Sequence, residues 1–471
     1  MYTNSQIKPM MIFTKTASTV TCLLLYIILV LPVYGQQTGL SIKEMLQKVQ
    51  GNLPQLEVYR QQTAASSQNI LLAKNSLVPD LTVGYQLNMA TFNNITGMSY
   101  PGFLLPISGP PTVGNTLHFV PGSALGTIVK WNPLTFGQRK AAIEKATAQF
   151  KQANSTYKEQ LFEYQYRAIN TYLEAIYLKQ IIKALQASIT RNQANLEQSL
   201  VLAMNGLKPG IDTTQFQSAI TQSEIDELQA GKSYQQSVIE LTRLSGIENN
   251  ASSILLTDTI FQHQLFLVDD TASIANSHPL FQVAASQRET TAASLKEIQK
   301  SWTPQLDFWG NVYARGSGVD ASGNIHPSDG YNLSRTNMGL GFQLSFPLLQ
   351  FSKTNIQKKQ YSLLLKSDEA RMQQVKLDIT KQIETATMQY QEDVKIADKM
   401  PRLLQSANAV YQGLQISYEN GLIDYARLAE AQYDLVKAEL ADANANLQLW
   451  RSLLAVAIAK GDLAIFLKQV K

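Results

Sequence analysis

The longest uninterrupted stretch of this chain is residues 138–205, which contain neither glycine nor proline. Folded as one helix, this stretch would be about 100 Å long at ~1.5 Å per residue, far longer than the helices of ordinary globular domains. Residues 348–400 and 422–460 are also free of glycine and proline. The sequence therefore predicts an elongated, mainly α-helical molecule rather than a compact globule.

Apolar side chains recur in two of these stretches at a mean spacing of about 3.5 residues, which is the period of a coiled coil. Several of them are alanines, which let helices pack closely. The same spacing would suit the core of a four-helix bundle, but the length of the helices favours a long coiled-coil wall. The two series are Leu161, Tyr164, Ala168, Tyr172, Ala175, Leu178, Ile182 and Leu185, and then Leu428, Ala431, Leu435, Ala438, Ala441, Ala445 and Leu449.

The chain contains the same pattern of landmarks twice. Pro54 and Pro79 recur as Pro279 and Pro304, both at one constant spacing, which we call the first offset. Later landmarks recur at a slightly shorter constant spacing, the second offset, which relates Trp131, Gly206 and Gly246 to Phe346, Gly421 and Gly461. Constant offsets on rare residues indicate a duplicated helix-strand-strand-helix-helix unit, with the longer loop in the first copy. We predict a first repeat at 36–247, a connection at 248–271 and a second repeat at 272–471.

Each repeat also has two segments in which apolar and polar residues alternate, as in strands with one apolar face. They are predicted at about 80–90, 123–132, 305–314 and 336–346. Strands of about ten residues suit a transmembrane barrel, but four strands cannot close one and would leave unpaired edges in hydrocarbon. We therefore expect copies of the chain to share a barrel, and three copies would supply twelve strands.

Trp131 and Phe346 lie at the ends of predicted strands, in phase with the apolar face. They are candidates for the aromatic residues that mark a membrane interface. The alternative is that they only pack within the protein.

Residues 1–35 are predicted to be a secretory signal peptide. Lys8 and Lys15 precede a short apolar run, and Met11 is an alternative start. The run is too short for a permanent transmembrane helix, although a retained anchor is the alternative. The single cysteine, Cys22, belongs to this segment, so the mature chain would have no disulfide and no thiolate chemistry.

Composition and motifs exclude several functions. The 471 residues include 40 Lys+Arg against 36 Asp+Glu with no dense basic run, so nucleic acid is not an expected partner. A mean hydropathy of −0.12 excludes a polytopic helical membrane protein. The four histidines lack metal-ligand spacing, and neither a phosphate-binding loop nor a hydrolase motif occurs. We expect no catalysis, no cofactor and no metal.

The order of these elements resembles the outer membrane efflux family typified by TolC. The resemblance covers the mature chain and rests on Ser76-Leu-Val-Pro79 and Ser301-Trp-Thr-Pro304 before strands, and Trp131-Asn-Pro-Leu-Thr-Phe-Gly137 after one. It implies a homotrimer, with a twelve-strand barrel among outer-membrane lipids and a long α-helical tunnel in the periplasm. It also implies two protein partners, a periplasmic adaptor (membrane fusion) protein and an inner-membrane transporter of the RND or ABC type.

The resemblance further implies roles for the distal helix turns. Asn205 and Gly206, like Asn420 and Gly421, would form the turns of the adaptor-facing tip.

Acidic residues near these turns line the closed end of the tunnel in the family. Asp212 and Glu430 match such positions, whereas Arg427 departs from the pattern at the counterpart of Asp212. The resemblance thus implies a periplasmic constriction of these three residues. Asp212 could instead be a plain helix N-cap.

The predicted function is a passive outer-membrane exit duct of a tripartite efflux pump or a type I secretion system. A non-conducting structural coiled-coil protein at the cell surface is the alternative. A secreted enzyme would need a convergent polar site, which the sequence does not offer. The transported compound is left open.

Overall fold

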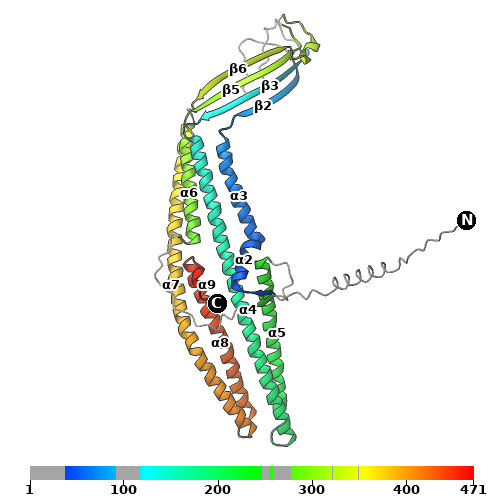
Figure 1. Ribbon diagram of the computed structural model, residues 1–471, viewed down its shortest axis with the longest axis vertical. Helices are drawn as coiled ribbons and strands as arrows, with labels where there is room; N and C mark the ends of the chain where they lie inside the picture. Colours follow the sequence, from blue (N-terminus) through cyan, green and yellow to red (C-terminus); the bar gives the residue numbers. More distant parts are fainter. Residues whose placement is uncertain are drawn as a thin grey trace, which may run out of the picture.

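The computed structural model describes residues 38–91, 117–246, 254–257, 277–320, 322–347 and 349–470. This part of the chain is elongated, with a sheet at one end and long helices running away from it (Figure 1). The predicted signal peptide at 1–35 lies outside the described residues, as does most of the predicted connection at 248–271.

The elements follow one another in the predicted order, and the predicted combination of long helices with four strands is confirmed. The first half contains α2 (Ile42–Asn52), α3 (Pro54–Asn75), β2 (Asp80–Thr91), β3 (Phe119–Leu134), α4 (Gln138–Met204) and α5 (Ile211–Ser245). The second half contains α6 (Pro279–Lys300), β5 (Gln305–Ser317), the 3-10 helix η3 (Pro327–Tyr331), β6 (Arg335–Ser345), α7 (Gln350–Glu419), α8 (Tyr425–Ala459) and α9 (Ala464–Leu467). Two short strands, β1 (Thr38–Leu40) and β4 (Ile254–Leu256), pair in parallel.

The four long strands form one antiparallel sheet in the order β2-β3-β5-β6. Its two hairpins pair in the same register, because Asp80 lies opposite Lys130 and Gln305 lies opposite Ser345. Gln305 is the counterpart of Asp80 by the first offset, and Ser345 is the counterpart of Lys130 by the second. The two hairpins are therefore structural repeats of each other.

Two strands are longer than predicted at the far end of the sheet. β3 begins at Phe119 and β5 continues to Ser317. The backbone N–H of Gly318 donates to the carbonyl of Pro121 at 3.0 Å, so the following loop extends the ladder. The alternation of apolar and polar side chains does not reveal such hydrogen bonds, so the sequence could not predict these longer strands.

The junction between sheet and helices is fixed by polar contacts. The guanidinium of Arg139, near the start of α4, donates to the hydroxyl of Ser76 at 3.1 Å and to the carbonyl of Pro133 at 3.1 Å. In the second half the hydroxyls of Ser301 and Thr354 lie 3.4 Å apart. These residues are related to Ser76 and Arg139 by the same two offsets, so the same two positions meet at both junctions, although α7 begins three residues before the counterpart of the first residue of α4.

The main apolar core lies midway along the helices, where α2 and α9 pack beside α4 and α8 (Figure 1). Its largest buried side chains include Tyr172, Trp450 and Phe466. The Tyr172 hydroxyl donates to the carbonyl of Leu40 at 2.8 Å, which attaches the start of the described chain to the core. This core places the duplicated helices side by side and leaves their distal halves as two projecting hairpins.

Toward the distal end the seam on α4 changes from apolar to polar. Ser188, Asn192, Asn195 and Ser199 continue the heptad spacing and are buried. The Asn195 amide donates to the hydroxyl of Tyr411 on α7 at 3.1 Å. The contact between the α4/α5 and α7/α8 hairpins is thus partly made of hydrogen bonds.

Candidate functional site

One face of the sheet is apolar and exposed along its whole length. Directly opposed residues lie on the same face, so the register joins the apolar positions of all four strands into one surface. The exposed members are Leu81, Val83, Tyr85, Leu87, Met89, Leu125, Val129, Trp131, Phe308, Val312, Met338, Leu340, Phe342 and Leu344. A contiguous apolar surface of this size needs lipid or protein to cover it.

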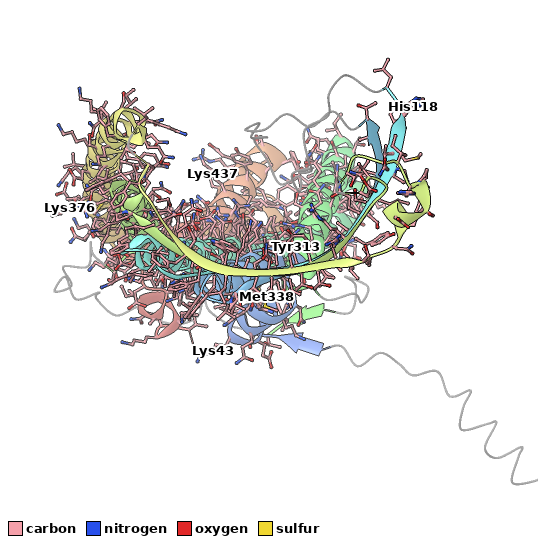
Figure 2. All side chains as sticks on the ribbon, turned by 90° about the horizontal axis from the view of Figure 1, so that it is seen from above. Lys43, His118, Tyr313, Met338, Lys376 and Lys437 are labelled. Atoms are coloured by element: carbon pink, nitrogen blue, oxygen red, sulfur yellow. The ribbon has the colours of Figure 1, made fainter. Side chains whose placement is uncertain are left out.

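The other face carries mainly polar or small residues, among them Gln86, Gly126 and Asn311, together with the aromatic side chains of Trp309 and Tyr313. Viewed from above, the sheet is an arc (Figure 2). The helix α8, with Lys437, lies on the concave side of the arc, and α2, with Lys43, lies on the convex side (Figure 2). The arrangement is a segment of a curved wall rather than a closed fold.

Both outer strands have an open edge. Within the described residues, β2 pairs only with β3 and β6 pairs only with β5. Edge N–H and C=O groups cannot stay unpaired in hydrocarbon, so these edges require partner strands there.

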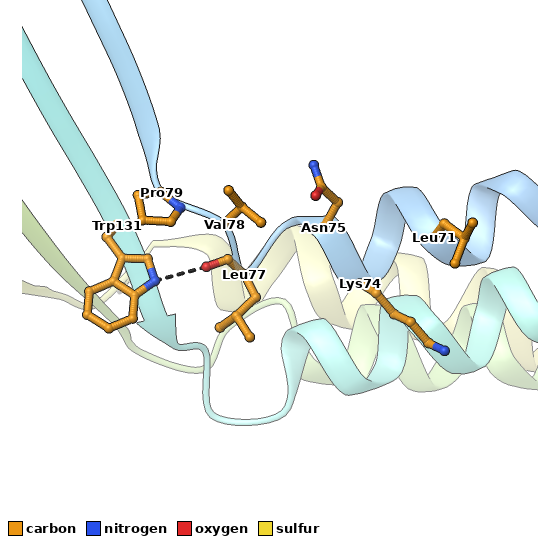
Figure 3. Close-up of a pocket in the computed structure, with 7 residues that line it drawn as sticks. All are labelled: Leu71, Lys74, Asn75, Leu77, Val78, Pro79 and Trp131. Carbon is orange, nitrogen blue, oxygen red and sulfur yellow. Dashed lines mark hydrogen bonds between the residues drawn. The ribbon is translucent and has the colours of Figure 1, made fainter.

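A groove of about 640 Å³ lies at the foot of β2, where α3 ends. Leu71, Leu77, Val78 and Trp131 provide most of its apolar lining (Figure 3). The indole Nε1 of Trp131 donates to the carbonyl of Leu77 at 2.9 Å, as the dashed line in Figure 3 shows. The ring is therefore held at the end of the apolar face, next to the helices.

Phe346 follows the last residue of β6 and is also exposed. It lies at the edge of the sheet, at the counterpart of Trp131. The structure therefore puts both aromatic residues at the level where sheet and helices meet, and their role at a membrane interface stays a prediction.

The two distal turns have the same construction. Gly206 and Gly421 adopt φ angles of 71° and 74°, in the left-handed region that favours glycine. The side-chain amides of Asn205 and Asn420 each donate to a carbonyl one turn back in the preceding helix, at 2.9 and 2.8 Å. Both turns lie at the end of the molecule opposite the sheet (Figure 1).

Asp212 connects the two hairpins close to these turns. The hydroxyl of Tyr418 on α7 donates to the carboxylate of Asp212 on α5 at 3.0 Å. Asp212 is only 6% exposed in the single chain, and the pKa of the Tyr418 hydroxyl is raised by burial and, more weakly, by Asp212. The N-cap of α5 is Gly210, so Asp212 is in the first turn of the helix and is not its N-cap.

The other two predicted constriction residues are exposed. The guanidinium of Arg427 lies 3.6 Å from the carboxylate of Glu430 on the same helix. The backbone N–H of Arg427 donates to Asp424, which caps α8. The structure therefore brings Arg427 and Glu430 together at the surface, whereas Asp212 makes a buried contact with Tyr418.

Sequence reasoning missed two participants at this end of the molecule. Lys208, in the α4–α5 turn, donates to the carbonyl of Ile423 in the α7–α8 turn, and its ammonium lies 5.0 Å from the centroid of the Tyr418 ring. Tyr418 has no motif around it. Its heptad spacing from Tyr411 and Tyr425 was the one available signal.

The described part of the chain contains no helix that is both long and apolar enough to cross a bilayer. Nor do the described residues bring together three or more His, Cys, Asp or Glu side chains that could hold a metal ion.

Residues 272–462 match the family model for outer membrane efflux proteins. No curated protein sequence matches significantly. The outer membrane protein VceC from Vibrio cholerae has a similar structure, with a TM-score of 0.71 and 14% identity over 89% of this chain and 96% of that one. The MtrE outer membrane channel of Neisseria gonorrhoeae gives a TM-score of 0.69 and 12% identity over 89% of each chain.

The CmeC outer membrane channel of Campylobacter jejuni is also similar, with a TM-score of 0.71 and 12% identity over 89% of this chain and 85% of that one. At such low identity these likenesses establish the fold. The family match covers residues 272–462 and the shared fold extends over most of the chain, so both agree with the likeness to outer membrane efflux proteins that the sequence pattern indicates.

Proposed function

We propose that this protein is the subunit of a trimeric, passive exit duct in the outer membrane. One observation carries the proposal: an exposed apolar face, on strands of bilayer length with two open edges, continues directly into long paired helices. Such a face suits lipid, and the open edges are satisfied when copies pair into a closed barrel. The polar face would then line an aqueous path.

The duct has no catalytic role. Members of the family are transport ducts and not enzymes, so export draws its energy from a partner. We propose that a periplasmic adaptor and an inner-membrane transporter of the RND or ABC type supply it. The distal turns support this assignment, because Met204, Leu207 and Leu422 are exposed there and offer an apolar docking surface.

We further propose that the distal end is the constriction of the duct. Asp212 would close it by holding α5 against α7 through Tyr418. Arg427 and Glu430 are exposed at the start of α8, next to the α7–α8 turn. Their ion pair lowers the net charge that a solute would meet there. Asp212 would thus act by holding the two helices in place, whereas Arg427 and Glu430 would face the solute path directly.

Planar-bilayer recording tests the duct. Purified trimers added to a bilayer should give discrete, long-lived conductance steps. Assembled trimers that never conduct would contradict the proposal and favour a structural surface protein.

A further inference from the structure

The junction between the two halves of the chain is built around one pair of glutamines. The side-chain amide of Gln138, at the start of α4, donates to the carbonyl of Thr303 at 3.0 Å. Gln305, at the start of β5, donates to the side-chain oxygen of Gln138 at 2.8 Å. Together these bonds join the end of the first hairpin to the beginning of the second.

The duplication assigns a counterpart to each of these residues. The second offset relates Gln138 to Lys353, and the first offset relates Gln305 to Asp80. The matching registers of the two hairpins show that both offsets hold within the sheet, and the Ser301–Thr354 contact, at the counterparts of Ser76 and Arg139, shows that they also relate the first turns of α4 and α7. Lys353 and Asp80 would therefore be the two interacting residues of a second junction, in the places of Gln138 and Gln305.

Within one chain this second junction cannot form. Asp80 begins β2 and Lys353 follows β6, at opposite edges of the sheet, so three interstrand spacings of about 4.8 Å separate their strands. Both side chains are exposed, and neither makes an ion pair with another described residue. Asp80 and Lys353 carry opposite charges, whereas Gln305 and Gln138, their counterparts in the junction inside the chain, are neutral amides.

We propose that β6 of one copy pairs with β2 of the next in the register of β3 with β5, and that Lys353 and Asp80 form an ion pair between the copies. The inference rests on the proposed duct and specifies how its subunits join. In the β3–β5 ladder Lys130 lies opposite Trp309, so the offsets place Ser345 opposite Gly84 of the neighbouring copy.

This register keeps the apolar face continuous across the boundary between copies. It sets Leu344 opposite Tyr85, Phe342 opposite Leu87, and Leu340 opposite Met89, all of which are exposed in the single chain. A slip by one residue would turn one strand's apolar side chains to the polar face.

Burial along the helices points the same way. Ala141 and Ala148 on α4 are 1% and 7% exposed, whereas their counterparts on α7, Ile356 and Leu363, are 68% and 65% exposed. The two α4 positions are thus covered by other parts of the same chain. Their counterparts on α7 carry larger apolar side chains and are left uncovered. A neighbouring copy would cover them.

The groove at the foot of β2 has an occupant in this arrangement (Figure 3). Leu349, the counterpart of Leu134 by the second offset, is the N-cap of α7 just beyond the end of β6, so in this arrangement it would lie close to the foot of β2 of the next copy. Leu349 is 90% exposed in the single chain. It would enter the edge of the groove, beside Val78.

Disulfide trapping tests the ion pair directly, since the predicted mature chain has no cysteine. Asp80→Cys combined with Lys353→Cys, oxidised as trimers in detergent, should give covalent dimers and trimers on a denaturing gel. A link inside one chain is excluded, because disulfides need Cα atoms within about 7 Å. The matched control is Asp80→Cys with Lys376→Cys, about 35 Å further along α7, which should give no links.

Charge reversal provides a second readout. Asp80→Lys and Lys353→Asp should each lower the temperature at which trimers dissociate, since every trimer loses three ion pairs and gains three contacts between like charges. Combining the two should restore it. The control Lys43→Asp, on the convex side (Figure 2), should have no effect.

The outcomes separate this inference from the duct itself. Conducting trimers without the Asp80–Lys353 link, or reversals whose losses simply add, would overturn the proposed junction and leave the duct intact. A chain that forms neither trimers nor conductance would overturn the duct.

Discussion

The hydroxyl of Tyr418 donates a 3.0 Å hydrogen bond to the carboxylate of Asp212, and this bond ties together the distal ends of the two helical hairpins. Both side chains are buried, at 1% and 6% exposure. Asp212 is also in the first turn of α5, where the helix dipole favours a negative charge. The Asp212–Tyr418 pair is therefore placed to control how far apart the two hairpins lie. It affects the charge along the solute path only indirectly.

Tyr418→Phe should loosen the distal end and raise the single-channel conductance. A buried hydrogen bond to a charged group contributes about 1.5–3 kcal/mol, so its loss should let the hairpins separate more often. Asp212→Ala should act in the same way, and the double variant should conduct no more than the stronger single variant. Adding Glu430→Ala to Asp212→Ala should raise conductance further, because Glu430 is exposed. Unchanged conductance in assembled trimers of these variants would remove the residues from the constriction.

The turn glycines allow a test of backbone conformation alone. A Cβ added at Gly206 or Gly421 would meet no atom within 4 Å, so alanine there introduces only the left-handed strain. Each of these two substitutions should destabilise its hairpin by about 1 kcal/mol. Gly231→Ala is the matched control, since this glycine is inside α5 with equally open surroundings, and it should stabilise by about 0.5–1 kcal/mol. Thermal unfolding followed by circular dichroism in detergent would measure both signs, and losses of equal size at all three glycines would contradict the assignment.

Stability should depend on pH through His278. This residue caps α6, because its Nδ1 accepts from the backbone N–H of Leu280 at 3.2 Å while Nε2 lies 3.1 Å from the carbonyl of Ile458. The folded protein thus holds the ring neutral, and burial lowers the pKa of the His278 imidazole. The unfolded chain then binds more protons, so stability present at pH 7.5 should fall as the pH drops below about 6.5.

His278→Asn should flatten this dependence, because asparagine keeps a capping oxygen and does not titrate. The measurement is the unfolding temperature at pH 7.5 and pH 5.5. His118→Asn, at an exposed histidine just before β3, is the control and should leave the wild-type slope unchanged. An unaltered slope in His278→Asn would exclude the capping histidine as its source.

Much of the fold was predictable because long helices and alternating strands leave strong periodic signals. The glycine- and proline-free runs marked α4, α8 and the first part of α7, which continues through Pro401 to Glu419. The constant offset between Pro79 and Pro304, and the second one between Trp131 and Phe346, revealed the duplication from the sequence alone. These signals depend only on local backbone geometry and on side-chain period, which a single sequence contains.

The contacts between hairpins were not predictable in the same way. Arg191 on α4 makes a bidentate ion pair with Glu439 on α8, across 248 residues of sequence. The polar seam at Asn192 and Asn195 looked like the end of an apolar heptad series rather than its continuation. Such pairs depend on how two helices are placed around each other, and no spacing within either helix records that.

The close fit between Trp309 and Gly341 should determine how well the sheet folds. The two residues are directly opposed on the polar face, and a Cβ at Gly341 would lie 2.9 Å from the Trp309 indole. Gly341→Ala should therefore force the ring to move, at about 1–3 kcal/mol for overpacking, and should lower both the refolding yield and the unfolding temperature. Gly310→Ala is the control on the neighbouring position of β5, because the nearest atom to its Cβ would be 3.8 Å away. Replacing the indole with a smaller side chain, as in Trp309→Leu, should relieve the cost of Gly341→Ala. If Gly341→Ala and Gly310→Ala unfold at the same temperature, the ring has room to move, and the glycine is not required by the indole.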